Sequence, residues 1–462
     1  MPRGRSRDDY IVQLSEMAET DTTTTSSTAR MEDRSRFQDM IRSLKYRNFQ
    51  LFFSGQLISR TGTWMDNIAE AWLVYRLTGS SLLLGTVAFA GQVPVFFLAP
   101  LGGMVADRLN RRRILMATQT ASMILAFILA MLTLTKRITV WEVVVLAALL
   151  GIVNAFDIPA RQAFLVELVG REDLMNAIAL NSSMFNGARV IGPSIAGILV
   201  ASIGEGWCFF ANSVSYIAVI AGLLMMRIDR APVENHSASP FEHIAEGFRF
   251  VRGTAPIKAL MMLTGLVSLV ALPYSVLMPI FAARILHGNA RTLGVLMGAT
   301  GMGALAGALT LATRTKLQGL GSWVASASAG FGTCLILFSL SRWYFLSVIL
   351  LIPAGFCVMV QMASANTLIQ AMVPDRLRGR TMAVHSMMFI GMAPIGALFA
   401  GALADRIGAP WTVAIGGVGA IIGSAVFARH LPKIRVEARE LIIAQGMAGG
   451  EPSQELTARS VS

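Results

Sequence analysis

The chain has 462 residues, of which 54% are hydrophobic and only 14% are charged, and its mean hydropathy is +0.59. Soluble globular proteins carry about 25% charged residues, so this composition excludes an ordinary cytosolic enzyme. The net charge of +12 is better explained by basic loops that orient a membrane protein than by a nucleic acid partner, and we expect no nucleic acid. Three scattered cysteines, Cys208, Cys334 and Cys357, have no spacing typical of disulfides or zinc, so we expect no metal and no cofactor.

Residues 1–47 form a polar N-terminal tail. They mix charges of both signs with a run of threonine and serine from Thr22 to Thr28, and they contain no apolar segment long enough for a core. This composition is typical of disordered chain and not of a cleaved signal peptide. We therefore predict a disordered tail on the cytoplasmic side.

Twelve apolar windows follow the tail, and each approaches the roughly 20 residues that a helix needs to cross a bilayer. They lie near 49–77, 81–106, 113–135, 140–164, 174–202, 206–228, 257–285, 292–313, 321–341, 343–371, 380–404 and 410–429. A polar linker divides them six and six. We therefore predict an all-α integral membrane protein with 12 transmembrane helices in two pseudo-symmetric six-helix bundles. The predicted bundles cover 48–228 and 257–429, and a cytoplasmic tail covers 430–462.

The linker at 229–256 has a helical pattern of its own. Apolar residues recur at helical spacing from Phe241 to Val251, and charged residues from Glu242 to Arg252 occupy much of the other side. This pattern predicts a short amphipathic helix that lies along the cytoplasmic surface.

The loop charges predict the orientation. If the N-terminus lies inside, the inner loops and tails next to the windows hold 22 Lys and Arg residues, and the outer loops hold 7. Cytoplasmic loops carry the excess of Lys and Arg in membrane proteins. We therefore expect both termini in the cytoplasm, in agreement with the even number of windows, and a location in the plasma (inner) membrane.

An internal repeat relates the two halves. With a shift of 204 residues, 169–204 falls on 373–408 without a gap, and 13 of 36 positions are identical. Among these are the glycine pairs Gly192/Gly396 and Gly197/Gly401, and glycine allows helices to approach closely in lipid. Two repeated bundles are typical of transporters that hold a substrate near the bilayer midplane and expose it to each side in turn.

A basic loop after the second window carries the first motif. Its residues are Gly103, Asp107, Arg108, Asn110, Arg111 and Arg112. The segment resembles the loop signature of the major facilitator superfamily, with Asn110 where that family prefers glycine. Asparagine is the next best residue for a left-handed turn, so we expect the turn to be kept.

Further segments narrow the resemblance. The fifth window contains Gly192, Pro193, Ala196 and Gly197, which resemble the end of the antiporter motif of the same family. The stretches 157–167 and 373–380 are similar to the branch that contains bacterial enterobactin exporters and macrolide efflux proteins. The resemblance covers about 49–430 and implies the major facilitator fold and export. The arginine-bearing fourth-helix motif that the family often uses in proton coupling is absent.

The loop motif suggests a cytoplasmic latch. An aspartate can cap a neighbouring helix and an arginine can pair with a carboxylate. We hypothesise that Asp107 faces the start of the eleventh helix and that Arg111 or Arg112 pairs with Asp157, so that the latch holds the outward-facing state. The alternative is that Arg108 to Arg113 only enforce the topology.

The first window carries unusual polar residues. Gln56, Arg60, Thr63, Asn67 and Glu70 fall within about 80° on a helical wheel, and Asp66 lies at the edge of this stripe. Ionisable groups at membrane depth are functional candidates by default. We hypothesise that Asp66 or Glu70 titrates and that Arg189 is its counter-charge. The alternatives are a static ion pair, or a Glu70 that is simply solvated at the outer surface. The full set of predicted coupling and cavity residues is Gln56, Arg60, Thr63, Asp66, Asn67, Glu70, Asn154, Arg189, Gln361 and Asn366.

These observations favour a secondary active transporter over an enzyme. No Gly-x-x-x-x-Gly-Lys phosphate-binding loop is present, so ATP hydrolysis by that route is excluded. We expect a monomer in the lipid bilayer that exports small amphipathic molecules, such as drugs or siderophores, and that uses protons. An importer or facilitator of a metabolite is the alternative, and a membrane receptor or lipid-modifying enzyme is a more remote one.

Overall fold

The computed structural model describes residues 42–170, 172–227, 240–314 and 317–445, and these residues form helices joined by short turns, with no β-strand among them. Most of the predicted N-terminal tail, most of the linker before Pro240 and the last part of the C-terminal tail lie outside the described residues. The predicted all-α membrane architecture is confirmed.

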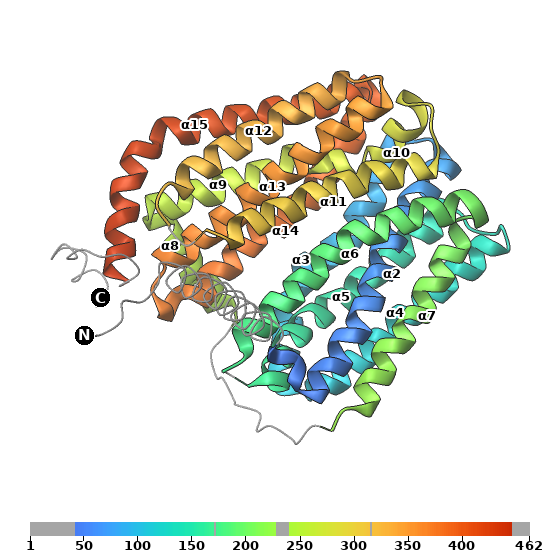
Figure 1. The fold of residues 1–462 in the computed structure, drawn as a ribbon, viewed down its shortest axis with the longest axis horizontal. Helices are drawn as coiled ribbons and strands as arrows, with labels where there is room; N and C mark the ends of the chain where they lie inside the picture. Colours follow the sequence, from blue (N-terminus) through green and yellow to red (C-terminus); the bar gives the residue numbers. More distant parts are fainter. Residues whose placement is uncertain (1–41, 171, 228–239, 315–316, 446–462) are drawn as a thin grey trace, which may run out of the picture.

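The first half of the chain contributes one short helix and six long ones. They are η1 (Arg42–Lys45), α2 (Arg47–Thr78), α3 (Ser81–Arg108), α4 (Arg111–Leu134), α5 (Val140–Val169), α6 (Leu174–Ile203) and α7 (Glu205–Met225). Figure 1 shows these helices together on one side of the molecule, in blue to green.

The second half begins with α8 (Pro240–Gly253), where the sequence predicts an amphipathic helix. The next segment spans Ala255–Ile285 but is broken, because Pro273 and Pro279 cannot donate backbone hydrogen bonds. Its parts are α9 (Ala255–Val270), η2 (Leu272–Ser275), α10 (Met278–Ile280) and η3 (Phe281–Ile285). The remaining helices are α11 (Ala290–Ala312), α12 (Leu320–Leu340), α13 (Tyr344–Met372), α14 (Asp375–Ile407) and α15 (Ala409–Ala444). Helix α15 therefore continues 15 residues beyond the predicted boundary at 429.

Eleven of the described helical segments are long and apolar enough to cross a membrane, and together with α2 they correspond to the twelve predicted windows. Helix α2 has 32 residues, so length does not set it apart. Its polar and ionisable residues lower its hydropathy, and α2 packs against α6 and α7.

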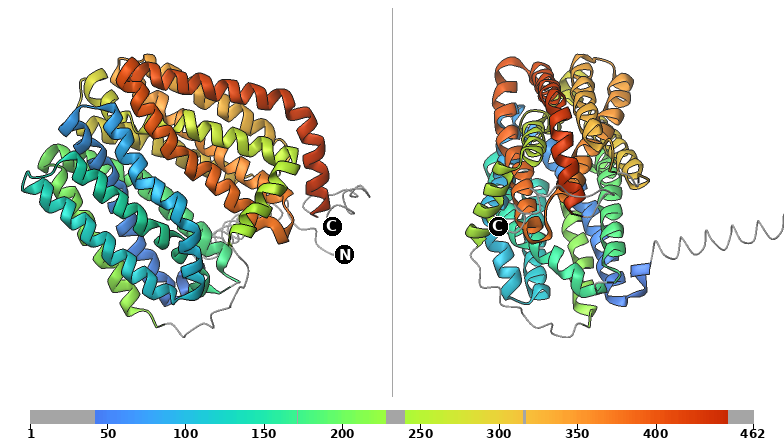
Figure 2. Two further views of the ribbon diagram at one scale, coloured as in Figure 1. Left: turned by 180° about the vertical axis from the view of Figure 1, so that it is seen from behind. Right: turned by 90° about the vertical axis from the view of Figure 1, so that its left-hand side faces the viewer.

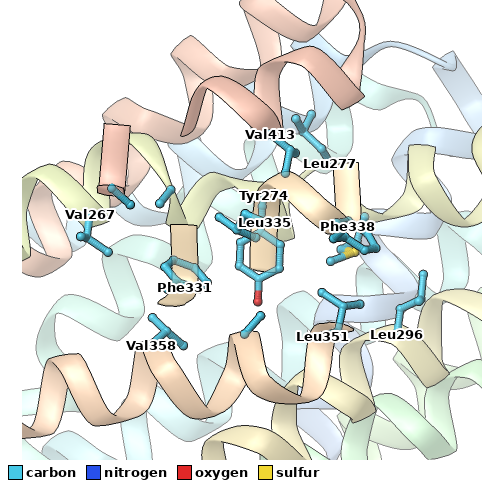
Figure 3. Packing of buried hydrophobic residues seen from close by; sticks show 14 of the residues in the cluster. Val267, Tyr274, Leu277, Leu296, Phe331, Leu335, Phe338, Leu351, Val358 and Val413 are labelled. Carbon is cyan, nitrogen blue, oxygen red and sulfur yellow. The ribbon is translucent and has the colours of Figure 1, made fainter. Parts of the chain in front are cut away.

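Aromatic packing fills the interior of the second half. The rings of Tyr274 and Phe331 meet edge to face at 5.7 Å, and those of Phe281 and Phe338 lie 4.5 Å apart. Figure 3 shows Tyr274 between Phe331 and Phe338, with Val358 and Leu351 on the helix opposite. The broken segment after α9 is therefore held by side-chain packing at the point where its backbone hydrogen bonding is interrupted.

One pair of glycines that the repeat aligns, Gly192 and Gly396, has equivalent neighbours in the two halves. A Cβ at Gly192 of α6 would lie 2.5 Å from the Cβ of Trp64 on α2, and a Cβ at Gly396 of α14 would lie 2.1 Å from the carbonyl oxygen of Leu269 on α9. In each half the fifth long helix thus contacts the first at a glycine. The sequence repeat therefore corresponds to a repeat in the structure.

The second aligned pair joins the two halves. A Cβ at Gly197 of α6 would lie 3.0 Å from the Cα of Gly294 on α11, and a Cβ at Gly401 of α14 would lie 2.6 Å from the carbonyl oxygen of Ser81 on α3. The backbones are in direct contact at both places, which only glycine allows.

Polar contacts between the halves lie at the same end of the molecule as the contacts of Gly197 and Gly401. Arg284 donates to the carbonyl oxygen of Gly79 at 3.1 Å, and the hydroxyl of Ser80 lies 3.5 Å from a carboxylate oxygen of Asp405. Figures 1 and 2 show the two sets of helices converging toward α10 and diverging toward η1 and α8.

We predict that Gly401→Val separates this closed end, because the added side chain overlaps the backbone of α3. Spin labels at Leu77 and Ile407, with the native cysteines replaced by serine, should show a longer distance in the variant by pulsed electron resonance. Gly187→Val is the matched control, because a Cβ at Gly187 meets nothing within 4 Å. An unchanged distance in Gly401→Val would contradict the conclusion that the two halves are closed against each other at this end.

Candidate functional site

A cavity of about 340 Å³ lies between the two halves, within the range typical of small-molecule sites. Helices α2, α3 and α5 line it from the first half, and η2, α10 and α11 line it from the second. Most of its wall is apolar. Its larger polar or aromatic side chains are Trp64, Asn67, Glu70, Gln92 and Asn154.

A second, much smaller cavity of about 20 Å³ lies within the first half, between α2, α4, α5 and α7. Asp66, Glu70, Ser122, Asn212 and Tyr216 are its polar lining residues. The side chain of Asp66 is almost fully buried, and its Oδ1 atom has no hydrogen-bond partner in the protein. Glu70 lines both cavities.

The local sequence of α2 explains this arrangement. Asp66 and Glu70 are four residues apart, so they lie one above the other on a helix. Gly62 is one turn earlier, and a Cβ there would lie 2.7 Å from the amide oxygen of Asn212 on α7. The absence of a side chain at Gly62 thus brings α7 and its Asn212 close to α2 on the side where Asp66 is buried.

A polar network lies nearer the diverging end. Thr118 and Gln119 of α4 donate to the Asp157 carboxylate at 2.9 and 2.8 Å. Arg161 pairs with the same carboxylate at 2.9 Å and extends to the amide oxygen of Gln56 on α2 at 3.4 Å. Both members of this ion pair are largely buried, with 4% and 15% of their side chains exposed. The network connects three helices of the first half.

The aligned position in the second half is uncharged. A shift of 204 residues places Asp157 on Gln361 of α13, which is fully buried and donates to the hydroxyl of Thr264 on α9 at 3.3 Å. Each half therefore has a hydrogen bond from its fourth long helix to a neighbour at this place, but only the first half uses charges.

The structure separates the predicted cavity residues into groups. Asn67, Glu70 and Asn154 line the large cavity, and Asp66 lines the small one. Gln56 belongs to the Asp157 network and Gln361 is buried inside the second half, so neither lines these two cavities. The remaining predicted residues outside both linings are Arg60, Thr63, Arg189 and Asn366.

Arg189 is not the counter-charge of the acidic residues in this conformation. Its guanidinium lies 5.8 Å from the ring centre of Trp64, and the ion pairs among the described residues include neither Asp66 nor Glu70. The aromatic face of Trp64 takes the place that we expected a carboxylate to occupy.

The basic loop is also paired differently from the expectation. Arg111 binds Glu167 at 2.6 Å, and Arg112 donates to the carbonyl oxygen of Leu224 at 3.1 Å. Asp157 is buried and already paired, so neither loop arginine reaches it, and that part of the latch hypothesis is not met in this conformation.

Other residues of the loop motif have simpler surroundings. The expected left-handed turn at Asn110 is wrong, because its φ is −63°; Asn110 caps α4 instead, and its side-chain oxygen accepts a hydrogen bond from the backbone of Arg113 at 3.1 Å. Asp107 and Arg108 are exposed, and a Cβ at Gly103 would meet nothing within 4 Å. In the antiporter-like motif, Gly192, Pro193, Ala196 and Gly197 are all buried.

An ionic cluster that the sequence analysis did not identify fixes the start of α2. Asp173 precedes α6, and its carboxylate pairs with Arg42 and, at 2.7 Å, with Lys45. The hydroxyl of Tyr46 donates to it at 2.8 Å. Lys45, then Tyr46 and Arg42, lower the pKa of Asp173 to about 2. The only sequence signal for this cluster is a short basic run and an aspartate that lie far apart in the chain. Such combinations are common, so they do not predict a contact.

Sequence reasoning also left out Trp64, Gln92, Asn212 and Tyr216 as site residues. Trp64 and Tyr216 resemble ordinary apolar core positions, and Gln92 and Asn212 are isolated polar residues within apolar windows. Their place around the carboxylates depends on how α2, α3 and α7 pack.

Comparison with known proteins gives consistent results. The family described as "Transmembrane secretion effector", one of the major facilitator families, matches residues 40–460. The chain is 27% identical to the staphyloferrin A transporter of Staphylococcus aureus over 397 residues, which cover 84% of this chain and 98% of that protein. It is 27% identical over 367 residues to the multidrug efflux pump Tap of Mycolicibacterium fortuitum, with 78% and 89% covered.

The enterobactin exporter EntS of Salmonella typhimurium is 25% identical over 375 residues, with 81% of this chain and 90% of that protein covered. Among solved structures, a bacterial homologue of the human lysosomal transporter Spinster has a TM-score of 0.61 at 14% identity, covering 88% of this chain and 98% of that one. The structural likeness supports the fold.

We predict that Asp173→Asn lowers the melting temperature of the purified protein by a few degrees at neutral pH, because it removes the carboxylate that Arg42 and Lys45 share. A carboxylate with a lowered pKa stabilises the fold above its unfolded-state pKa, about 4, and loses this effect only as the pH falls toward 2. The difference from wild type should therefore be constant between pH 5 and 8.

Asp375→Asn is the control, since the Asp375 carboxylate pairs with Arg378 but is 87% exposed. Equal effects of the two variants, or a difference that varies between pH 5 and 8, would contradict the role of Asp173.

Proposed function

Because the chain belongs to the transmembrane secretion effector family of the major facilitator superfamily, we propose that it exports small amphipathic molecules by alternating access. The observation that supports this most strongly is the 340 Å³ cavity, which both halves line. A site shared by two repeated halves is exposed to one side or the other when they rock.

The basic loops supply the orientation. The end at which the halves diverge carries η1, α8 and the Arg111 loop, and cytoplasmic loops of membrane proteins are rich in Lys and Arg. In this proposal both termini are cytoplasmic, and the conformation described here is the inward-facing state in an inner membrane.

The cavity chemistry suits an amphipathic substrate. Its wall is mainly apolar, with the indole of Trp64 and the polar groups of Asn67, Gln92 and Asn154 as anchors. Three relatives are named for staphyloferrin A, for several drugs and for enterobactin. We propose a drug or a siderophore as the substrate class, a proton gradient as the energy source and a monomer as the working unit.

We retain the latch in a revised form. Asp107 is exposed at the end of α3 where the halves diverge. When the halves close at this end, Asp107 would approach the N-terminus of α14, where exposed backbone N–H groups favour a carboxylate. In the inward-facing state Arg111 of the loop forms an ion pair with Glu167 of its own half.

We predict that cells expressing the protein accumulate less of at least one compound among staphyloferrin A, enterobactin, erythromycin and ethidium, and that a protonophore restores accumulation. Ala88→Trp should abolish this difference, because Ala88 lines the cavity and an indole would fill much of it. Ala211→Trp, at an exposed position of α7, is the matched control. Greater accumulation in expressing cells would indicate an importer.

We also predict that Asp107→Asn reduces export at least tenfold without changing the amount of protein in the membrane. The amide cannot supply the charge that the closed cytoplasmic end requires. Asp405→Asn is the comparison, because Asp405 is an aspartate near the C-terminal end of α14, at the end where the two halves meet. Wild-type export in Asp107→Asn would contradict the latch.

A further inference from the structure

Two carboxylates on one face of α2 lie in cavities of very different size. We infer that Asp66 and Glu70 form a two-step proton site, in which Glu70 exchanges protons with the large cavity and Asp66 holds the proton in the small cavity behind it. This inference rests on the proposed proton-coupled export and assigns the coupling to one site.

The size of the small cavity supports a single water molecule between the two groups. Its volume of about 20 Å³ exceeds the roughly 10–15 Å³ that one water needs, and polar groups line it. The Oδ1 atom of Asp66 is buried without a protein partner. Buried polar atoms are nearly always hydrogen-bonded, so a water bound there completes the coordination of this oxygen.

The surroundings of Asp66 contain no paired cation. The titratable groups that face it are Glu70 on its own helix and Tyr216 and Cys208 on α7. Helices α4 and α5 add Ser122 and apolar side chains to the chamber.

The nearby arginines are directed elsewhere. Arg60 interacts electrostatically with Asp157 and Tyr216, and Arg189 lies over Trp64. An unpaired carboxylate is costly to remove from water, so a charge at Asp66 requires access of water to the chamber. Proton transfer at Asp66 is therefore tied to the opening of this space.

Glu70 connects the small cavity, where Asp66 lies, to the large cavity. Because Glu70 lines both cavities, its protonated carboxyl can donate to the bridging water, which passes a proton to the Asp66 carboxylate. One O–H bond breaks at Glu70 and one forms at Asp66, and Glu70 is left as the anion. Glu70 then takes a new proton from the large cavity, or it contacts a substrate there.

The division of roles can be tested without a substrate. Infrared difference spectra of the purified full-length protein in lipid nanodiscs, recorded after a pH step, report the carbonyl stretch of protonated carboxyl groups. We expect Asp66→Asn to remove one such band. Glu70→Gln should leave that band in place but slow its deuterium exchange at least tenfold, because the exchange path passes through Glu70.

Tyr216→Phe and Asp405→Asn complete the set. Tyr216 lines the chamber and interacts electrostatically with Asp66, so Tyr216→Phe, which keeps the ring but removes the hydroxyl, should shift the frequency of the Asp66 band without removing it. Asp405 lies at the opposite end of α14, and its replacement should change neither band nor exchange rate. Monodisperse gel filtration shows that each variant is folded.

Two results would overturn the inference. One is a set of bands that Asp66→Asn leaves unchanged, and the other is wild-type exchange at Asp66 in Glu70→Gln. Neither depends on transport, so both are distinct from a failure of the export proposal. If export occurs, Asp66→Asn should lose protonophore-sensitive export against a gradient and retain downhill movement.

Discussion

Direct backbone contact between helices is the constraint on which the arrangement depends. In lipid, helices gain little from burying apolar side chains against one another, so close packing of small residues must hold the bundles together. At Gly197 and Gly401 the two halves meet without an intervening side chain, and at Gly192 and Gly396 each half closes on its own first helix. Because the repeat places these glycines in register, one pattern serves both the rigid contacts within a half and the contacts between halves.

The polarity of α2 is a consequence of its position. A helix that exposed Arg60, Asp66 and Glu70 to acyl chains would be strongly disfavoured. Here the other helices of the first half surround it on one side, and the large cavity lies on the other. The same residues that keep α2 below the usual hydropathy of a membrane span therefore identify it as the helix beside the cavity.

The sequence was sufficient for the fold class and for the repeat, because both depend on periodic patterns along the chain. Of the residues that it predicted for the cavity, Asn67, Glu70 and Asn154 line the large one, since polar residues on one face of an apolar helix have few other places to lie. The predicted pair between Asp157 and a loop arginine belongs to the outward-facing state and stays a prediction, whereas in the conformation described here Asp157 pairs with Arg161. Arg161 is four residues further along the same helix, where an ion pair forms without any movement of a loop. The sequence paired Arg189 with an acidic residue, whereas in this conformation Arg189 lies over the ring of Trp64. Spacing along the chain does not distinguish these two neighbours.

The two halves share their packing but not their charge, and this difference bears on where coupling takes place. Asp157 and Arg161 form a buried ion pair in the first half, whereas the aligned Gln361 makes a neutral hydrogen bond. The acidic residues Asp66 and Glu70 also belong to the first half. In the proposed coupling, a proton that moves onto or off these groups changes the charge of one bundle only, and the glycine contacts within each bundle remain as they are. In the proposed coupling, the conformational preference of the molecule follows the charge state of the first half, because the second half has a neutral hydrogen bond at the position aligned with Asp157.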